Sequence, residues 1–181
     1  MLILASQSPR RSELLQRAGI PFVTQPADVD ETPRNGETPE QYVKRIAELK
    51  ALAVEAGPED IVLGADTAVV IDNRILGKPA DQSDAARMLD TLSGRKHEVV
   101  TGICLKHGGQ ILVDWAVTQV WFAVMSAEEI EEYAASGEPM DKAGAYAIQG
   151  LASKFIERID GCYANVVGLP IALLYKHLRC Q

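Results

Sequence analysis

Runs of apolar residues alternate along the chain with segments in which apolar residues recur every three or four positions. The first pattern is typical of buried strands and the second of amphipathic helices. We expect strands over 2–5, 20–26, 60–72, 74–79, 97–107, 110–125 and 153–159. We expect helices over 8–18, 38–53, 81–94, 128–137 and 170–178, and a loop over 138–150. The strand over 60–72 is expected to break in its middle, at Gly64, Asp66 and Thr67, and its second half is expected to form a hairpin through Asn73 with the strand over 74–79.

Residue types that begin helices stand at the expected helix starts. Ser8 precedes a proline, which is tolerated at the first helical position because its missing N–H has no partner there. Thr38 with Gln41 and Ser126 with Glu129 have the spacing of a capping box. Helices interleaved with strands, hairpins included, predict an α/β or α+β fold with a mixed sheet.

Length and composition narrow the class of protein. At 181 residues, we expect one domain that spans 1–181. No apolar run approaches the length of about 18 residues that a membrane span needs, and the apolar run at 2–5 is too short for a signal peptide, so we expect a cytoplasmic protein. A net charge of −7 argues against extended binding to nucleic acid, which needs a broad basic surface.

Cysteines and histidines indicate neither disulfides nor a zinc site. The three cysteines, Cys104, Cys162 and Cys180, are odd in number, far apart and outside any CxxC motif. The three histidines are isolated, whereas metal sites usually contain spaced pairs of ligands.

The stretch SQSPRR, residues 6–11, concentrates hydrogen-bond donors and positive charge where a helix is expected to begin. A helix start offers free N–H groups and a partial positive charge, which suit a phosphate. Ser6, Ser8, Arg10 and Arg11 would add donors and charge there. The alternative is a capped helix with two solvent-facing arginines. Neither a Walker motif nor GxGxxG is present.

Asp66 follows an apolar run and should emerge at the carboxyl end of a buried strand. A carboxylate there needs a metal, a cation or a reacting water as its partner. If this strand is parallel to the strand over 2–5, Asp66 and SQSPRR lie at the same edge of the sheet, where open α/β sheets bind ligands. Gly64 would allow a ligand to approach closely. The alternative is a turn aspartate before Thr67.

An acidic loop and three isolated polar residues are weaker candidates. Asp28, Asp30 and Glu31 have the oxygen ligands that Mg²⁺ or Mn²⁺ prefers, or they belong to a solvated loop. The candidates that follow the acidic loop are Lys50, on the inward side of its helix, Lys78, in a GKP turn, and Gln149, in the glycine-flanked loop AYAIQG. Either lysine could reach phosphate or extend into solvent. Gln149 could read a base edge, because an amide both donates and accepts.

The motifs SQSPRR, VDETP, GADT, LGKP and AGAYAIQG, in this order, closely resemble the Maf family of nucleoside triphosphate pyrophosphatases. The resemblance runs from LILASQSPRRSELL to VVGLPIALL. It implies a two-lobed α/β fold with a central cleft, similar to inosine triphosphate pyrophosphatases, and a metal-dependent reaction that releases pyrophosphate. It also implies that Asp66 is the proton acceptor. Arg10, Thr67 and Gln149 match the specificity positions of the branch that acts on dTTP and UTP, and the pattern of the 7-methyl-GTP branch is absent.

Residues and resemblance together predict a mechanism. Arg10, Arg11, Lys50, Lys78 and a divalent metal would balance the charge of a triphosphate, which is about −4. Glu31 is the best candidate for holding the metal, Mg²⁺ or Mn²⁺, together with Asp66. Water held by Asp66 would attack the α-phosphorus and pyrophosphate would leave.

Alternatives to this enzyme activity stay open. One is a nucleotide-binding regulator of cell division or septum formation that does not catalyse. Another is a metal-dependent phosphatase that removes only the terminal phosphate. The expected partner is a nucleoside triphosphate, including modified pyrimidine nucleotides, with no nucleic acid and no membrane. A homodimer is left open.

Overall fold

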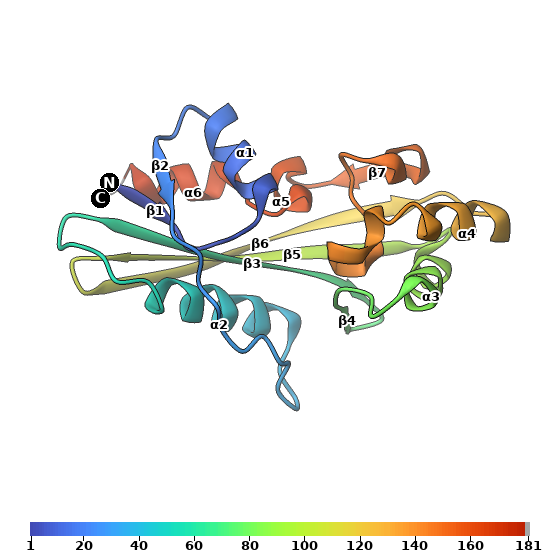
Figure 1. Cartoon of the computed structure of the whole chain (residues 1–181), viewed down its shortest axis with the longest axis horizontal. Helices are drawn as coiled ribbons and strands as arrows, with labels where there is room; N and C mark the ends of the chain where they lie inside the picture. Colours follow the sequence, from blue (N-terminus) through green and yellow to red (C-terminus); the bar gives the residue numbers. More distant parts are fainter. Residues whose placement is uncertain (180–181) are drawn as a thin grey trace. The chain divides into compact units, whose positions relative to one another are not determined.

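The computed structural model describes residues 1–179, so Cys180 lies outside the described residues. The strands are β1 (Leu2–Leu4), β2 (Phe22–Thr24), β3 (Ile61–Ile71), β4 (Arg74–Leu76), β5 (Lys96–His107), β6 (Gln110–Phe122) and β7 (Ile156–Asp160). The α-helices are α1 (Pro9–Arg17), α2 (Pro39–Leu52), α3 (Gln82–Leu92), α4 (Ala127–Ala135), α5 (Tyr163–Val167) and α6 (Ile171–Leu178). Short 3₁₀ helices are η1 (Glu138–Asp141), η2 (Ala143–Ala145) and η3 (Leu151–Phe155). The predicted α/β class is confirmed (Figure 1).

Within the described part of the chain, seven strands form a mixed sheet. The order is β2-β1-β3-β5-β6-β7, and β4 pairs with β3 outside this path. β1 pairs in parallel with both β2 and β3, with Leu2 opposite Phe22 and Ile61. β4 is antiparallel to β3, and β7 is antiparallel to β6. The parallel pairing of β1 with β3 is the arrangement on which the prediction of a site shared by Asp66 and SQSPRR depends.

The chain divides into two compact units. Within the described residues, the first unit comprises Met1–Thr67, Val100–Ala116 and 164–179, and the second comprises Ala68–Val99 and Val117–Tyr163. The strands β3, β5 and β6 contribute residues to both units. Two compact units agree with the two lobes that the resemblance implies, whereas the central cleft stays a prediction.

The first unit has helices on both faces of its strands, with α1 and α6 on one face and α2 on the other (Figure 1). Successive strand residues point to opposite faces, so β1 supplies both cores. Leu4 packs in one cluster with Leu15 of α1 and Leu174 of α6. Ile3 packs in the other cluster with Ala47 of α2.

The backbone of α2 lies unusually close to the sheet. A Cβ atom at Gly64 would stand 2.0 Å from the Ala47 carbonyl oxygen, and one at Gly102 would stand 2.5 Å from the Val43 carbonyl oxygen. Gly64 therefore makes room for α2, and the expectation that it makes room for a ligand is wrong. The close approach also brings the end of α2 near the middle of β3.

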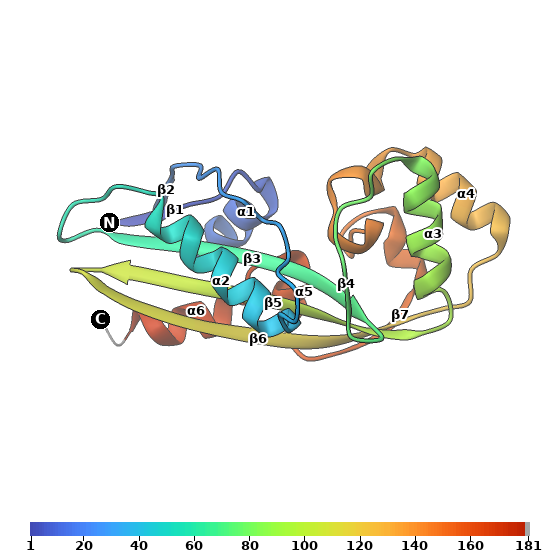
Figure 2. The ribbon, with the colours of Figure 1, turned by 90° about the horizontal axis from the view of Figure 1, so that it is seen from below.

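The second unit packs α3 against α4 (Figure 2). Its core contains the rings of His97, Phe122 and Tyr146, which meet edge to face with centroids 4.8 to 5.4 Å apart. Burial lowers the pKa of His97 to about 4, so this imidazole is neutral near pH 7. None of the helices within residues 1–179 has the length and apolar character that crossing a bilayer requires.

Local signals predicted helix starts well and irregular segments poorly. Both capping boxes form, at Thr38 with Gln41 and at Ser126 with Glu129. Ser8 is the N-cap residue of α1, but its side chain makes no capping hydrogen bond.

Several predicted elements differ from the structure. β3 continues through 61–71 without a break, because its second half pairs with β4. The expected strand over 153–159 begins only at Ile156, since η3 precedes it. The expected loop over 138–150 contains η1 and η2, and α5 was not predicted.

Candidate functional site

The SQSPRR segment leads from β1 into α1, and two of its polar side chains, those of Ser6 and Arg11, are buried. Ser6 Oγ accepts hydrogen bonds from the Ser8 backbone N, at 3.2 Å, and from Arg11 Nη1, at 3.0 Å. Arg11 is only 8% exposed, and Arg10 is half-buried. The alternative of two solvent-facing arginines is therefore wrong for Arg11.

The Arg11 guanidinium links three segments of the first unit. Nε donates to the carbonyl oxygen of Gly168, at 2.8 Å, and Nη2 donates to Thr67 Oγ1, at 3.2 Å. Gly168, the glycine of the motif VVGLP, has φ +129, a backbone conformation that favours glycine. A glycine at this position therefore allows the conformation of the residue whose carbonyl oxygen accepts from Arg11. Burial lowers the pKa of Arg11 and the nearby Asp66 carboxylate opposes the change, but a guanidinium stays charged at neutral pH.

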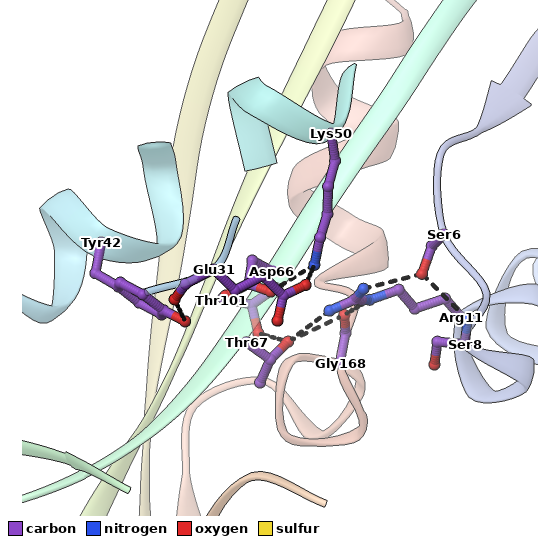
Figure 3. Close-up of polar contacts among 10 residues, drawn as sticks. All are labelled: Ser6, Ser8, Arg11, Glu31, Tyr42, Lys50, Asp66, Thr67, Thr101 and Gly168. Carbon is purple, nitrogen blue, oxygen red and sulfur yellow. Dashed lines mark hydrogen bonds and ion pairs between the residues drawn. The ribbon is translucent and has the colours of Figure 1, made fainter. Parts of the chain in front are cut away.

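A buried ammonium lies between two carboxylates at the end of α2 (Figure 3). Lys50 Nζ is 2.8 Å from Asp66 Oδ1 and 2.6 Å from Glu31 Oε1. The Lys50 and Asp66 side chains are 10% and 9% exposed, whereas Glu31 is 44% exposed. The buried Asp66 thus has a cation as its partner, one of the three partners expected for it.

Asp66 lies in the middle of β3, not at the carboxyl end of a strand as the sequence analysis expected. The neighbouring strand β1 ends at Leu4, and Ala5 N still donates to the Leu63 carbonyl oxygen, at 2.8 Å. Beyond that bond, the chain turns into the SQSPRR segment. Asp66 consequently lies past the end of β1, and this explains how a residue within a strand approaches a loop.

Electrostatic effects on Asp66 oppose one another. Burial raises the pKa of its carboxyl group, and the Lys50 ammonium and the Arg11 guanidinium act against this rise. The nearby Glu31 carboxylate raises the pKa further. A carboxylate with a raised pKa is a stronger base than an exposed one.

Thr67 connects the arginine to the interior of the first unit. Its Oγ1 lies 3.0 Å from Thr101 Oγ1, which in turn donates to the carbonyl oxygen of Asn165, at 3.2 Å. Thr101 and Gly168 were not predicted as parts of the site. Both contacts join segments far apart in sequence, which no local pattern indicates.

The acidic loop is held by α2. Tyr42 Oη donates to the carbonyl oxygen of Glu31, at 3.0 Å, and Arg45 Nη2 donates to that of Thr32, at 3.1 Å. Arg45 also makes two hydrogen bonds to the Glu37 carboxylate, at 2.5 and 2.7 Å. Tyr42 and Arg45 were not predicted as positioning residues, although their spacing places them on one face of a helix.

The other two acidic candidates differ from Glu31. Asp30 Oδ1 accepts a hydrogen bond from the Thr32 backbone N, at 2.9 Å, so it stabilises its own loop. Asp28 is exposed. Of the three acidic candidates, Glu31 is the one in contact with Lys50 and thus close to Asp66.

Lys78 and Gln149 belong to the second unit, and both are exposed. Gln149 lies in a turn between η2 and η3. Their part in a site shared with Asp66 stays a prediction.

The carboxylates of Glu31 and Asp66 fit a divalent cation by their chemistry. Within residues 1–179, no three side chains of His, Cys, Asp or Glu gather into a metal-binding group. Both carboxylates nevertheless converge on one nitrogen, that of Lys50. Mg²⁺ is commonly held by one or two carboxylates, with substrate phosphates supplying the remaining oxygens.

The fold and this site define an α/β protein in which a buried carboxylate lies among cationic side chains, an arrangement suited to phosphate chemistry. The chain belongs to the Maf family, because the family model described as "Maf-like protein" matches residues 1–181.

Curated relatives cover nearly the whole chain. A dTTP/UTP pyrophosphatase of Koribacter versatilis is 54% identical over 179 residues, which are 98% of this chain and 93% of the relative. A dTTP/UTP pyrophosphatase of Symbiobacterium thermophilum is 54% identical over 171 residues, 94% of this chain and 88% of the relative. Among solved structures, the Ham1 protein of Staphylococcus aureus matches with a TM-score of 0.55 at 16% identity, over 98% of this chain and 97% of that chain. This last similarity supports the α/β fold alone.

Proposed function

We propose that this protein is a nucleoside triphosphate pyrophosphatase that hydrolyses dTTP and UTP to the monophosphate and pyrophosphate. Relatives about half identical over nearly the full length carry the name dTTP/UTP pyrophosphatase. The structural observation that supports the proposal best is the buried Asp66 carboxylate, which lies 2.8 Å from Lys50 Nζ and within the electrostatic influence of Arg11. A base surrounded by cations suits attack on a phosphate.

The charges of this cluster indicate how a triphosphate binds. Lys50 and Arg11 contribute two positive charges, and Glu31 and Asp66 contribute two negative charges, so the four side chains are neutral together. A triphosphate of about −4 therefore needs further positive charge. Arg10, Lys78 and a divalent cation provide it in our proposal. Ser6 and Ser8 add hydroxyl groups to the phosphate-binding set.

Arg11 has donors to spare for a phosphate oxygen. A guanidinium has five N–H groups, and three of them donate to Ser6, Thr67 and Gly168. The remaining two are the candidates for contact with the substrate. The three internal bonds hold the planar group in one orientation, which reduces the entropy that binding costs.

Glu31 and Asp66 would hold the divalent cation, Mg²⁺ or Mn²⁺, and this cation would neutralise charge that develops on the phosphate oxygens. Tyr42 and Arg45 fix the loop that carries Glu31. The exposed Glu31 carboxylate thereby stays close to the buried Asp66.

Asp66 is the proton acceptor in the proposed reaction. Asp66 Oδ1 accepts from Lys50, and Oδ2 holds the attacking water. The water oxygen forms a bond to the α-phosphorus, the bond from this phosphorus to the bridging oxygen breaks, and the water proton passes to Asp66. Pyrophosphate leaves with the bonding electrons. Burial, which raises the pKa of Asp66, strengthens it as a base.

Arg10, Thr67 and Gln149 select the pyrimidine in this proposal. The assignment rests on the resemblance of these positions to the dTTP and UTP branch. A glutamine amide can pair with the O4 and N3–H edge of thymine or uracil, because it both donates and accepts. Modified pyrimidine nucleotides with the same edge are further substrates.

Residues 1–181 act as one functional domain, the protein works in the cytoplasm, and its substrate is free nucleotide, not nucleic acid or membrane. Assembly as a homodimer stays open.

A nucleotide panel tests the proposal. Purified protein is incubated with dTTP, UTP, CTP, GTP, ATP and 7-methyl-GTP, with and without Mg²⁺ or Mn²⁺, and the products are identified. Monophosphate and pyrophosphate, with dTTP and UTP preferred, are the expected result. Diphosphate and phosphate would indicate a terminal phosphatase, and binding without turnover would indicate a nucleotide-binding regulator.

A further inference from the structure

Gln149 lies at the tip of a tight turn in the second unit. The Gly150 backbone N donates to the carbonyl oxygen of Ala147, at 3.1 Å, and closes the turn over 147–150. The Gln149 side chain is exposed. An exposed turn does not by itself hold a side chain in one position, so a second set of contacts must fix it if it is to read a base.

The Glu138 carboxylate holds the end of this turn. Both of its oxygens lie 3.1 Å from the backbone N of Leu151, directly after the turn. Glu138 Oε1 also accepts a hydrogen bond from Tyr133 Oη, at 2.7 Å. A carboxylate that receives an N–H and an O–H is held more firmly than one that receives either alone.

Tyr133 holds the beginning of the same turn. Its hydroxyl oxygen accepts a hydrogen bond from the backbone N of Ala147, at 3.3 Å, while its proton goes to Glu138. Tyr133 belongs to α4 and is only 3% exposed, so its ring is fixed by packing. Burial and the bond to Glu138 raise the pKa of Tyr133, which keeps the hydroxyl protonated as a donor.

Gly150 lets the carboxylate lie against the turn. A Cβ atom at this position would stand 2.2 Å from Glu138 Oε2 and 2.4 Å from Cδ. The backbone of Gly150, with φ −107 and ψ −152, is extended and allows other residues. The absence of a side chain therefore serves the contact with Glu138, not the conformation of the chain.

We infer that Glu138 and Tyr133, the Glu138–Tyr133 pair, are positioning residues for base selection by Gln149. They hold the backbone on both sides of Gln149, at Ala147 and Leu151, and so fix the backbone position from which its amide reaches the base. This inference rests on the proposed function, in which Gln149 reads the pyrimidine. It adds two residues, on α4 and η1, that do not touch the base themselves.

Preorganisation is the physical reason why a firmly held turn would improve base selection. A loose turn would let the Gln149 amide adapt to several base edges, whereas a fixed amide penalises every edge that does not match its donor and acceptor. Loss of the Glu138–Tyr133 pair should therefore reduce the difference between nucleotides more than it reduces the rate with the best one.

The experiment compares kcat/KM for dTTP and GTP in the wild-type protein and in five single variants. Glu138→Ala removes the carboxylate, Glu138→Gln keeps one acceptor oxygen, and Tyr133→Phe removes one hydroxyl. Gly150→Ala displaces the carboxylate without removing it. Glu132→Ala, an exposed change on α4 beside Tyr133, is the matched control.

We expect the ratio of kcat/KM for dTTP to that for GTP to fall by at least about tenfold in Glu138→Ala. Glu138→Gln should retain more of the ratio, Tyr133→Phe and Gly150→Ala should lower it, and Glu132→Ala should leave it unchanged. In a Gln149→Ala background, Glu138→Ala should change the ratio no further, because the two changes remove the same function, base selection by Gln149.

A ratio within about twofold of the wild-type value in folded Glu138→Ala, Tyr133→Phe and Gly150→Ala proteins overturns the inference while the proposed function stands. If Glu138→Ala does not fold, Tyr133→Phe and Gly150→Ala decide, since each is a smaller change. Wild-type protein that cleaves dTTP and GTP equally well overturns the proposed base selection, and the inference with it.

Discussion

Lys50 Nζ and Asp66 Oδ1 lie 2.8 Å apart, and both side chains are about nine-tenths buried. Sixteen residues separate the two along the chain, and the close approach of α2 to the sheet at Gly64 brings them together. A buried ion pair of this kind costs desolvation energy and is weak evidence for a purely stabilising role. Its position beside Arg11 and Glu31 instead favours a catalytic one.

Asp66→Asn should nearly abolish turnover and leave the fold intact. The amide keeps the shape of the side chain but cannot accept the proton, and loss of a general base lowers kcat by about 10²- to 10⁴-fold. The measurement is kcat with dTTP, together with circular dichroism. Asp90→Asn, at an exposed position of α3, is the control. A folded Asp66→Asn protein with more than half of the wild-type rate would remove Asp66 from the mechanism.

The pH dependence of kcat/KM should report the state of Asp66. Activity requires the carboxylate, so kcat/KM falls as the pH drops through the pKa of Asp66, and burial places this pKa above its ordinary value. Lys50→Met removes a neighbour that lowers this pKa. The acidic limb should therefore move to higher pH in Lys50→Met. An acidic limb at the same or a lower pH in Lys50→Met would contradict the assignment of this limb to Asp66.

Arg11→Ala should reduce both stability and kcat/KM. The change removes three hydrogen bonds and leaves Ser6, Thr67 and the Gly168 carbonyl without this partner, which costs about 1–3 kcal/mol in the free energy of unfolding. Arg17→Ala, on the exposed face of α1, should change it by less than about 0.5 kcal/mol. Denaturant unfolding measures the free energy of unfolding of the two variants, and steady-state kinetics with dTTP measures kcat/KM. Equal stability of the two variants would show that the buried contacts of Arg11 contribute little.

The acid stability of the first unit should depend on Glu37. The two hydrogen bonds from Arg45 lower the pKa of Glu37 from 4.5 to about 2. The folded pKa is depressed, so this contribution is fully present above about pH 4.5 and is lost as the pH falls toward 2. Glu37→Gln should flatten the pH dependence of unfolding in this range. A pH profile in Glu37→Gln that is parallel to the wild-type profile would contradict this interpretation.

Base selection should depend on Gln149. We expect kcat/KM for dTTP and UTP to exceed that for GTP, ATP and 7-methyl-GTP by at least about ten- to a hundredfold, the effect of one unpaired buried polar group. Gln149→Glu should reduce the difference, because a carboxylate cannot donate. Preference of the wild-type protein for 7-methyl-GTP would show that Arg10, Thr67 and Gln149 do not select pyrimidines.

The apolar run before Asp66 and the pairing of neighbouring strands could be predicted from the sequence, and side-chain contacts between distant segments could not. The apolar run before Asp66 and the parallel pairing with β1 place the carboxylate near SQSPRR, as expected. The hairpin that joins the second half of β3 to β4 was predicted and is confirmed, whereas the unbroken course of β3 through Asp66 was not predicted. The bond from Arg11 to Gly168 joins residues 157 positions apart. Such a contact is set by how α1 and the segment before α6 pack on the sheet, and periodicity carries no information about it.

Gly64 illustrates a second limit. A glycine inside a strand indicates a close approach of something to the backbone, but the sequence does not say what approaches. In this fold it is the backbone of α2, and the consequence for function is indirect, since the same approach brings Lys50 to Asp66.

Hydrolysis of dTTP in ¹⁸O-labelled water tests the central claim most directly. If Asp66 directs water to the α-phosphorus, the label appears in dTMP and the released pyrophosphate carries none. Mass spectrometry of the two products measures this. Label in pyrophosphate, or dTDP and labelled phosphate as the products, would contradict the account.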